Sequence, residues 1–140
     1  MAGTATPIFP QTIRGASAQI LNADGTTKKT LCAGGTNGTR IDAISVASTD
    51  TAARDLQLWM NNGSVDQLLC TVSIPINSGN ANNVAAVDLL RSSFGPMLAY
   101  DANGNRVLYV PNGYTLKVAA ATSVTATKQL DVLATAAGDY

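Results

Sequence analysis

Polar and apolar residues alternate most regularly over residues 55–61, which read DLQLWMN. Successive side chains of a β-strand point to opposite faces, so a period of two predicts a half-buried strand. The core-facing members of this strand are Leu56, Leu58 and Met60. The same alternation places Trp59 on the outer face, where it is the single tryptophan of the chain.

A second apolar run follows across the turn signal Asn62-Gly63 and ends before Pro75. Asn-Gly between alternating segments is the strongest short-range signal of a β-hairpin, and proline stops a paired strand. We therefore expect residues 65–74 to pair with 55–61. The residues expected on its inner face are Leu68, Cys70, Val72 and Ile74.

Turn signals recur about every ten residues along the rest of the chain, and this spacing is typical of sandwiches and barrels. They include Asp24-Gly25, Gly34-Gly35, Asn37-Gly38, Asn103-Gly104 and Asn112-Gly113. The strand-sized segments between them are 16–22 and 28–33, expected to form a hairpin, and 40–48, 106–110, 114–121 and 128–136. The pattern predicts an all-β fold, a two-sheet antiparallel sandwich of about eight strands, for which a jelly roll is one common topology.

Two segments depart from this pattern of strands and turns. Residues 1–15 contain Pro7 and Pro10, which neither propagate a helix nor pair fully in a sheet, so we expect an extended N-terminal arm followed by a sandwich domain over 16–140. Residues 84–93 are spaced better at 3.6 than at 2, which predicts one short helix.

Charge is scarce and balanced: 13% of the 140 residues are charged, with nine Lys and Arg against nine Asp and no Glu or His. Binding to nucleic acid or to an anionic membrane needs clustered cations, and none occur, so we expect neither as a partner. The absence of Glu, a good helix former, favours β-structure. No apolar run reaches the length of a transmembrane helix.

The residues that could support catalysis or hold a metal are few and dispersed. Cys32 and Cys70 have no metal-ligand spacing, and we expect buried free thiols rather than a disulfide. Without His, a nucleophile would need a lysine or carboxylate base, and no such motif is present. Residues 101–106 resemble the start of a calcium loop, but Arg106 stands where the loop needs glycine, so a tight Asn-Gly hairpin is expected. We expect no enzyme activity and no cofactor or metal.

Three apolar residues are candidates for contact with other subunits. Trp59 is an aromatic residue on an outer strand face, a residue type enriched at interface centres; the alternative is that it packs under the arm or the 84–93 segment. Ile8 and Phe9 lie in the arm without companions at strand or helix spacing. They pack either on their own sandwich or on a neighbouring subunit.

Several segments together carry a likeness to a known family. They are TPIFPQTI at 6–13, NADGT at 22–26, NGTRID at 37–42, RDLQL at 54–58, YDANGN at 100–105 and the terminal GDY at 138–140. The chain resembles the cement, or decoration, proteins of the capsids of tailed double-stranded DNA phages. The likeness covers nearly the whole chain, but it is a pattern of turns and strands with no chemically diagnostic motif.

The resemblance implies a jelly-roll sandwich that docks on the outside of the assembled capsid and bridges major capsid protein subunits. It also implies a homo-oligomer, with a dimer as the first expectation, located on the virion exterior and, during assembly, in the host cytoplasm. An alternative is a tail or host-recognition module that binds carbohydrate. The aromatic platform for that function would come from Trp59, Tyr100, Tyr109 and Tyr114.

Overall fold

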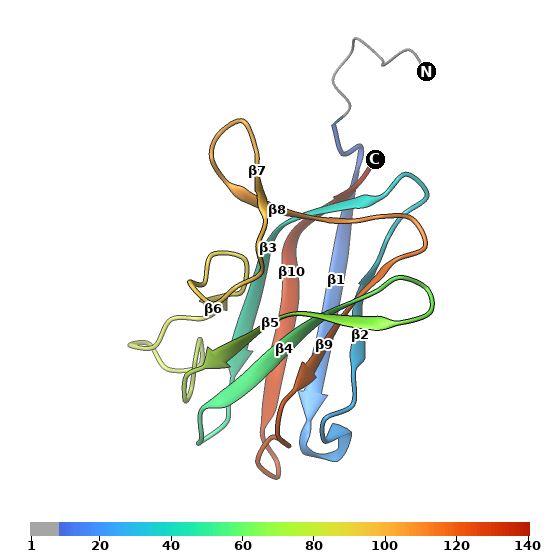
Figure 1. The fold of residues 1–140 in the computed structure, drawn as a ribbon. Helices are drawn as coiled ribbons and strands as arrows, with labels where there is room; N and C mark the ends of the chain where they lie inside the picture. Colours follow the sequence, from blue (N-terminus) through green and yellow to red (C-terminus); the bar gives the residue numbers. More distant parts are fainter. Residues whose placement is uncertain (1–8) are drawn as a thin grey trace, which may run out of the picture.

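Ten strands form two antiparallel sheets that pack face to face in the computed structural model, which describes residues 9–140 (Figure 1). The larger sheet has the order β1 (Thr12–Leu21), β10 (Gln129–Asp139), β3 (Thr39–Ser48), β8 (Arg106–Val110), β7 (Ala99–Tyr100), and the short β6 (Val87–Asp88) also pairs with β3. The smaller sheet has the order β2 (Lys29–Ala33), β9 (Thr115–Ala120), β4 (Arg54–Asn61), β5 (Asp66–Ile74).

The two-sheet antiparallel sandwich that the sequence pattern predicted is confirmed, and its connections make it a jelly roll, the topology that the family resemblance implied. With the two short strands β6 and β7 set aside, each strand passes to the opposite sheet from the one before it, apart from the β4–β5 hairpin. The two sheets then read β1-β10-β3-β8 and β2-β9-β4-β5, which is the arrangement of eight strands in two Greek keys.

The predicted hairpin between residues 16–22 and 28–33 is wrong. β1 pairs with β10 and β2 pairs with β9, so the two segments belong to different sheets. The chain crosses between the sheets through a 3-10 turn at Asn22–Asp24, where the Asp24 carboxylate accepts a hydrogen bond of 2.7 Å from the Leu21 amide. The Asp24-Gly25 signal therefore marks a turn that connects strands of two different sheets, and not the two strands of a hairpin.

The β4–β5 hairpin is confirmed, with one local difference. Leu56, Leu58 and Met60 are buried and Trp59 points outward, as the alternation predicted. The register shifts between Leu58 and Trp59, which leaves an extra residue in β5. This β-bulge turns Leu68 to the outer face, where 49% of it is exposed, instead of the inner face that a period of two predicted.

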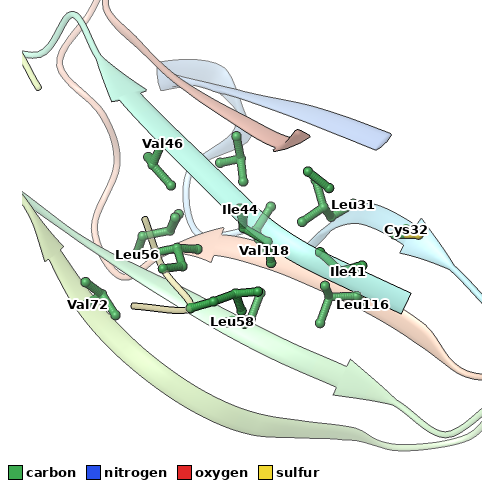
Figure 2. Packing of buried hydrophobic residues seen from close by; sticks show 14 of the residues in the cluster. Leu31, Cys32, Ile41, Ile44, Val46, Leu56, Leu58, Val72, Leu116 and Val118 are labelled. Carbon is green, nitrogen blue, oxygen red and sulfur yellow. The ribbon is translucent and has the colours of Figure 1, made fainter. Parts of the chain in front are cut away.

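Side chains from both sheets fill one continuous core (Figure 2). The larger sheet contributes Ile41, Ile44 and Val46 of β3, and the smaller sheet faces them with residues of β4 and β9. Those facing residues include Leu56, Leu58, Leu116 and Val118. Cys32 and Cys70 are free, buried thiols at the margin of this core, as expected.

Residues 84–93 form β6 and successive turns, so the predicted short helix is wrong. The Leu89 amide donates to the Ile44 carbonyl, which attaches this segment to β3, and the Asp88 carboxylate accepts from the Leu90 amide. β1 begins at Thr12, inside the segment 1–15 that was expected to form an extended arm. Residues 1–8, including Ile8, lie outside the described part.

A fully buried carboxylate joins the turns at one end of the sandwich. Asp50, between β3 and β4, accepts hydrogen bonds from Arg54 Nε at 2.7 Å and from the Thr125 amide and hydroxyl at 3.0 and 2.6 Å. Its fourth donor is the Ala52 amide at 3.1 Å. Both oxygens of the Asp50 carboxylate have hydrogen-bond partners, and the network therefore holds the turns at this end of the sandwich together.

Candidate functional site

Trp59 lies half-buried on the outer face of the smaller sheet, beneath a lysine. The Lys28 ammonium sits 3.8 Å from the centroid of the indole ring, a cation–π contact, and also donates to the Asp66 carboxylate at 3.1 Å. The segment after β6 lies beside Ser73 and Pro75, at the opposite end of β5 from Leu68, the cross-strand partner of Trp59. The indole N–H is buried without a hydrogen-bond partner among the described residues.

Asp66 gathers the polar groups around this ring. Hydrogen bonds from the Asn61 amide at 2.7 Å, Lys117 at 2.9 Å and Lys28 hold the pKa of Asp66 below its ordinary value. The face of Trp59 is thus occupied by the protein's own cation. Trp59 is therefore part of this polar cluster, with Lys28 over its ring.

A first exposed apolar patch lies where the chain enters β1, and we call it the β1 patch (Phe9 and Ile13). Ile13 is 95% exposed although it sits in a strand, and Phe9 is 70% exposed. Pro10 packs on Gly138, where a Cβ would come within 2.7 Å of the proline, and the Gln11 amide donates to the Asp139 carbonyl at 2.8 Å. Residues 10 and 11 are therefore fixed on their own sheet, while Phe9 and Ile13 stay exposed.

A polar network beneath the β1 patch holds it in place. Arg14 Nη1 donates to the Ala33 carbonyl at 2.7 Å and forms an ion pair with Asp139 at 3.2 Å. The Thr39 hydroxyl donates to the same carboxylate. The hydrogen bond from Thr39, followed by that from Arg14, holds the pKa of Asp139 below its ordinary value in spite of partial burial. The network ties β1 to β2, β3 and β10.

A second set of exposed apolar residues, which we call the β7 patch, lies on β7 and in the loop before it: Phe94, Met97 and Tyr100. Phe94 is 77% exposed, Tyr100 is 64% exposed and Met97 is fully exposed. Arg106 of β8 lies 5.9 Å from the centroid of the Tyr100 ring. The same guanidinium reaches the Leu90 and Ser92 carbonyls at 3.4 and 3.3 Å and so anchors the loop before β7.

Paired charges and small side chains lie between the two patches on the outer face of the larger sheet. Arg40 Nε donates to Asp42 at 2.7 Å and Arg40 Nη2 donates to Asp101 at 3.1 Å. Tyr109 and Tyr140 lie alongside with ring centroids 6.4 Å apart. The charges here are neutralised within the protein, so contact through this face would depend on shape and apolar area.

Most of the aspartate carboxylates form ion pairs within the protein. Seven of the nine aspartates pair with Lys or Arg, which leaves two of the nine for other roles. The Asp101 carboxylate also accepts from the amides of Asn103 and Asn105, so residues 101–105 form the predicted hairpin turn. Within residues 9–140, no three His, Cys, Asp or Glu side chains lie close enough together to hold a metal ion.

The structure treats the candidate contact residues differently. Phe9 is exposed, Trp59 is covered by Lys28, and Ile8 lies outside the described residues. The candidate sugar-binding aromatics lie apart on the two sheets: Trp59 and Tyr114 on the strands β4 and β9 or beside them, Tyr100 and Tyr109 on β7 and β8. Ile13, Phe94 and Met97 were missed, because sequence alternation does not reveal which apolar residues lack a neighbour.

No family model, curated protein or solved structure matches the chain. No helix in the described part of the chain is long and apolar enough to cross a membrane.

Proposed function

We propose that this protein is a structural component of a phage particle that binds the outside of the capsid and bridges major capsid protein subunits, stabilising the mature shell. The family resemblance suggests the setting. The observation that supports bridging is the position of the β1 and β7 patches at opposite edges of one sheet, whose order runs β1-β10-β3-β8-β7.

Two patches on one rigid sheet suit a clamp between two neighbours. Four strand spacings of about 4.8 Å separate β1 from β7, so the two sites are held roughly 19 Å apart across the sheet. Figure 1 shows β7 and the loop before it on the opposite side of the molecule from β1 and β2. A fixed separation allows binding to a lattice in which the two contacted subunits have the matching spacing, and not to one in which they do not.

The chemistry of the patches suits many repeated, uncharged contacts. Full burial of a side chain such as Ile13 or Met97 contributes roughly 1.5–3 kcal/mol. A clamp that binds the mature lattice and not the disassembled subunits stabilises that lattice by mass action. Because the patches contain no charged residue, their contribution to docking is expected to change little with salt.

Shells that lack this protein provide the test. Added wild-type protein is expected to saturate the shells and to raise the temperature at which they rupture. Ile13→Asp and Met97→Asp each remove one contact, so each is expected to weaken binding and to remove most of the thermal protection. Ile76→Asp, the same change at an exposed loop residue outside both patches, is the matched control and should behave as wild type.

The two single variants also separate bridging from simple coating. A protein that merely coats the shell through one patch would lose binding with one variant and keep it with the other. Shells as heat-resistant without the protein as with it would contradict the proposal.

A further inference from the structure

The sequence pair Asn-Gly occurs four times in the chain, and each of the four asparagines is exposed in a connection between two strands. In such a pair the backbone nitrogen of glycine can attack the side-chain amide carbon of asparagine, because glycine has no Cβ to hinder the approach. The attack needs a glycine nitrogen that can lose its proton and turn toward that carbon. The pairs are Asn37-Gly38, Asn62-Gly63, Asn103-Gly104 and Asn112-Gly113.

Three of the four glycine nitrogens are held by hydrogen bonds. The amides of Gly38 and Gly104 each donate to the carbonyl three residues earlier, at 2.9 and 3.0 Å. The Gly63 amide donates to Oδ1 of Asn61 at 2.7 Å. A nitrogen that donates in this way keeps its proton and its orientation, so an attack on the asparagine side chain has to give up a hydrogen bond first.

Gly113, in the connection between β8 and β9, is the exception. The Tyr114 amide donates to the Pro111 carbonyl at 3.0 Å, which places Asn112 and Gly113 at the two central positions of a β-turn. Within residues 9–140 the Gly113 amide donates to no acceptor. A Cβ built on Gly113 would meet no atom within 4 Å, so no other group packs over the residue on that side. The nitrogen of Gly113 is therefore free to react.

We propose that Asn112 is a self-modification site, which converts to aspartate and isoaspartate faster than the other three asparagines of Asn-Gly pairs. The Gly113 nitrogen gives its proton to hydroxide and forms a bond to Cγ of Asn112. The bond from Cγ to Nδ2 then breaks, and Nδ2 takes a proton from water and leaves as ammonia, which restores the hydroxide. One water molecule opens the five-membered succinimide that remains. Opening at one carbonyl gives aspartate, and opening at the other gives isoaspartate, in which the backbone runs through the former side chain.

The reaction removes a contact between two loops. Asn112 Nδ2 donates to the Thr36 carbonyl at 3.0 Å, which ties the β8–β9 turn to the connection between β2 and β3. The product has a carboxylate in place of the amide, and carboxylate oxygens only accept, so they form no hydrogen bond with a carbonyl. The Gly34 amide, which donates to the Tyr114 carbonyl at 2.9 Å, still joins the two loops. Conversion therefore adds a negative charge and loosens residues 34–38 without detaching them.

Peptide mapping of aged protein tests the order of conversion. Trypsin cuts after Lys and Arg and leaves each of the four Asn-Gly pairs in a different peptide. In folded protein kept at pH 8, mass spectrometry is expected to find conversion about two- to tenfold faster at Asn112 than at each other pair, the factor that one hydrogen bond supplies. The rate at Asn112 should rise with pH, because the attacking nitrogen has to lose its proton. In guanidinium chloride the unfolded chain lacks these contacts, and the four rates should become similar.

Hydrogen exchange tests the effect on the neighbouring loop. Asn112→Asp reproduces the aspartate product. Asn103→Asp is the matched control, the same change at an exposed turn residue whose side chain forms no hydrogen bond among the described residues. Asn112→Asp is expected to speed exchange of the Gly38 amide at least about twofold, since a hydrogen bond that holds its loop is lost. Asn103→Asp should leave that exchange rate unchanged.

Conversion at Asn112 that is no faster than at the other three pairs in folded protein would overturn the inference. The same order of rates in the unfolded chain would also overturn it, because the order would then come from the sequence and not from the fold. An Asn112→Asp protein with unchanged exchange at Gly38 would contradict the loosening of residues 34–38. Because no shell is present, these outcomes are separate from those that test capsid docking.

Discussion

Replacing Asp50 by Asn tests whether the buried carboxylate network holds the end of the sandwich together. The side chain of Asp50 is fully buried, and its two oxygens accept four hydrogen bonds, two each. Asparagine has nearly the same shape but offers one acceptor oxygen, and its amide group would face two donors. One oxygen of Asp50 accepts from Arg54 Nε and the Thr125 amide, and the other accepts from the Ala52 amide and the Thr125 hydroxyl. In the variant the positive charge of Arg54 would lose its ion-pair partner.

The contacts of Asp50 set the stability that the Asp50→Asn variant loses. Two hydrogen bonds to a charged acceptor are lost, at about 1.5–3 kcal/mol each. Breaking a buried ion pair by removing one partner costs about 3–5 kcal/mol. The Arg54 side chain is 17% exposed and can regain some hydration in the variant. We therefore expect the free energy of unfolding to fall by about 3 kcal/mol, the lower end of this range. For a domain of this size, that corresponds to a fall in Tm of roughly 10 °C.

Equilibrium urea unfolding at pH 7 measures the effect. Asp55→Asn is the matched control, because Asp55 is an exposed aspartate close by in the sequence and forms no ion pair among the described residues; it should change the free energy of unfolding by less than about 0.5 kcal/mol. An Asp50→Asn protein within 0.5 kcal/mol of wild type would refute the argument that this network stabilises the fold.

The same variant gives a pH dependence with a definite sign. Burial opposes ionisation of Asp50, but the hydrogen bonds from Thr125, Arg54 and the backbone outweigh it and hold the pKa below the ordinary 3.8. A carboxyl with a lowered folded-state pKa contributes stability above the unfolded-state pKa, and this is lost as the pH falls towards the folded-state pKa. The stability difference between wild type and Asp50→Asn should therefore be constant from pH 5 to 7 and narrow below about pH 4.

Two further predictions concern close packing. Gly34→Ala would bring a Cβ to 2.0 Å from the Pro111 carbonyl oxygen, so we expect a loss of at least about 2 kcal/mol in urea unfolding, whereas Gly15→Ala, with no atom within 4 Å, should be nearly neutral. Burial raises the pKa of the Cys32 and Cys70 thiols, so a thiol reagent at pH 7 should modify them slowly in the native protein and rapidly in urea; rapid native labelling would contradict their buried positions.

Local periodicity predicted the local part of the fold. The faces of β4 followed from its alternation, and the Asn62-Gly63 turn located the hairpin, because both depend on neighbouring residues alone. The orientation of Leu68 did not follow, because a single bulged residue reverses the alternation without any change in composition.

Pairing between distant segments could not be obtained in the same way. Nothing in residues 16–33 distinguishes a hairpin from a crossover, because the partners that decide it, β10 and β9, lie about a hundred residues away. Trp59 presents the same difficulty. The alternation placed it on the outer face of β4, but Lys28, which lies over its ring, is in the connection between β1 and β2, far away in the sequence. The exposure of Ile13 and Met97 likewise results from what the tertiary fold leaves uncovered.

A reconstruction of the intact phage particle by electron cryo-microscopy tests the bridging proposal most directly. The proposal predicts density for this sandwich on the outer surface of the capsid, with the β1 patch and the β7 patch each against a different major capsid protein subunit. Density confined to the tail, or a sandwich on the shell that touches one subunit through one face while Ile13 and Met97 remain in solvent, would contradict it.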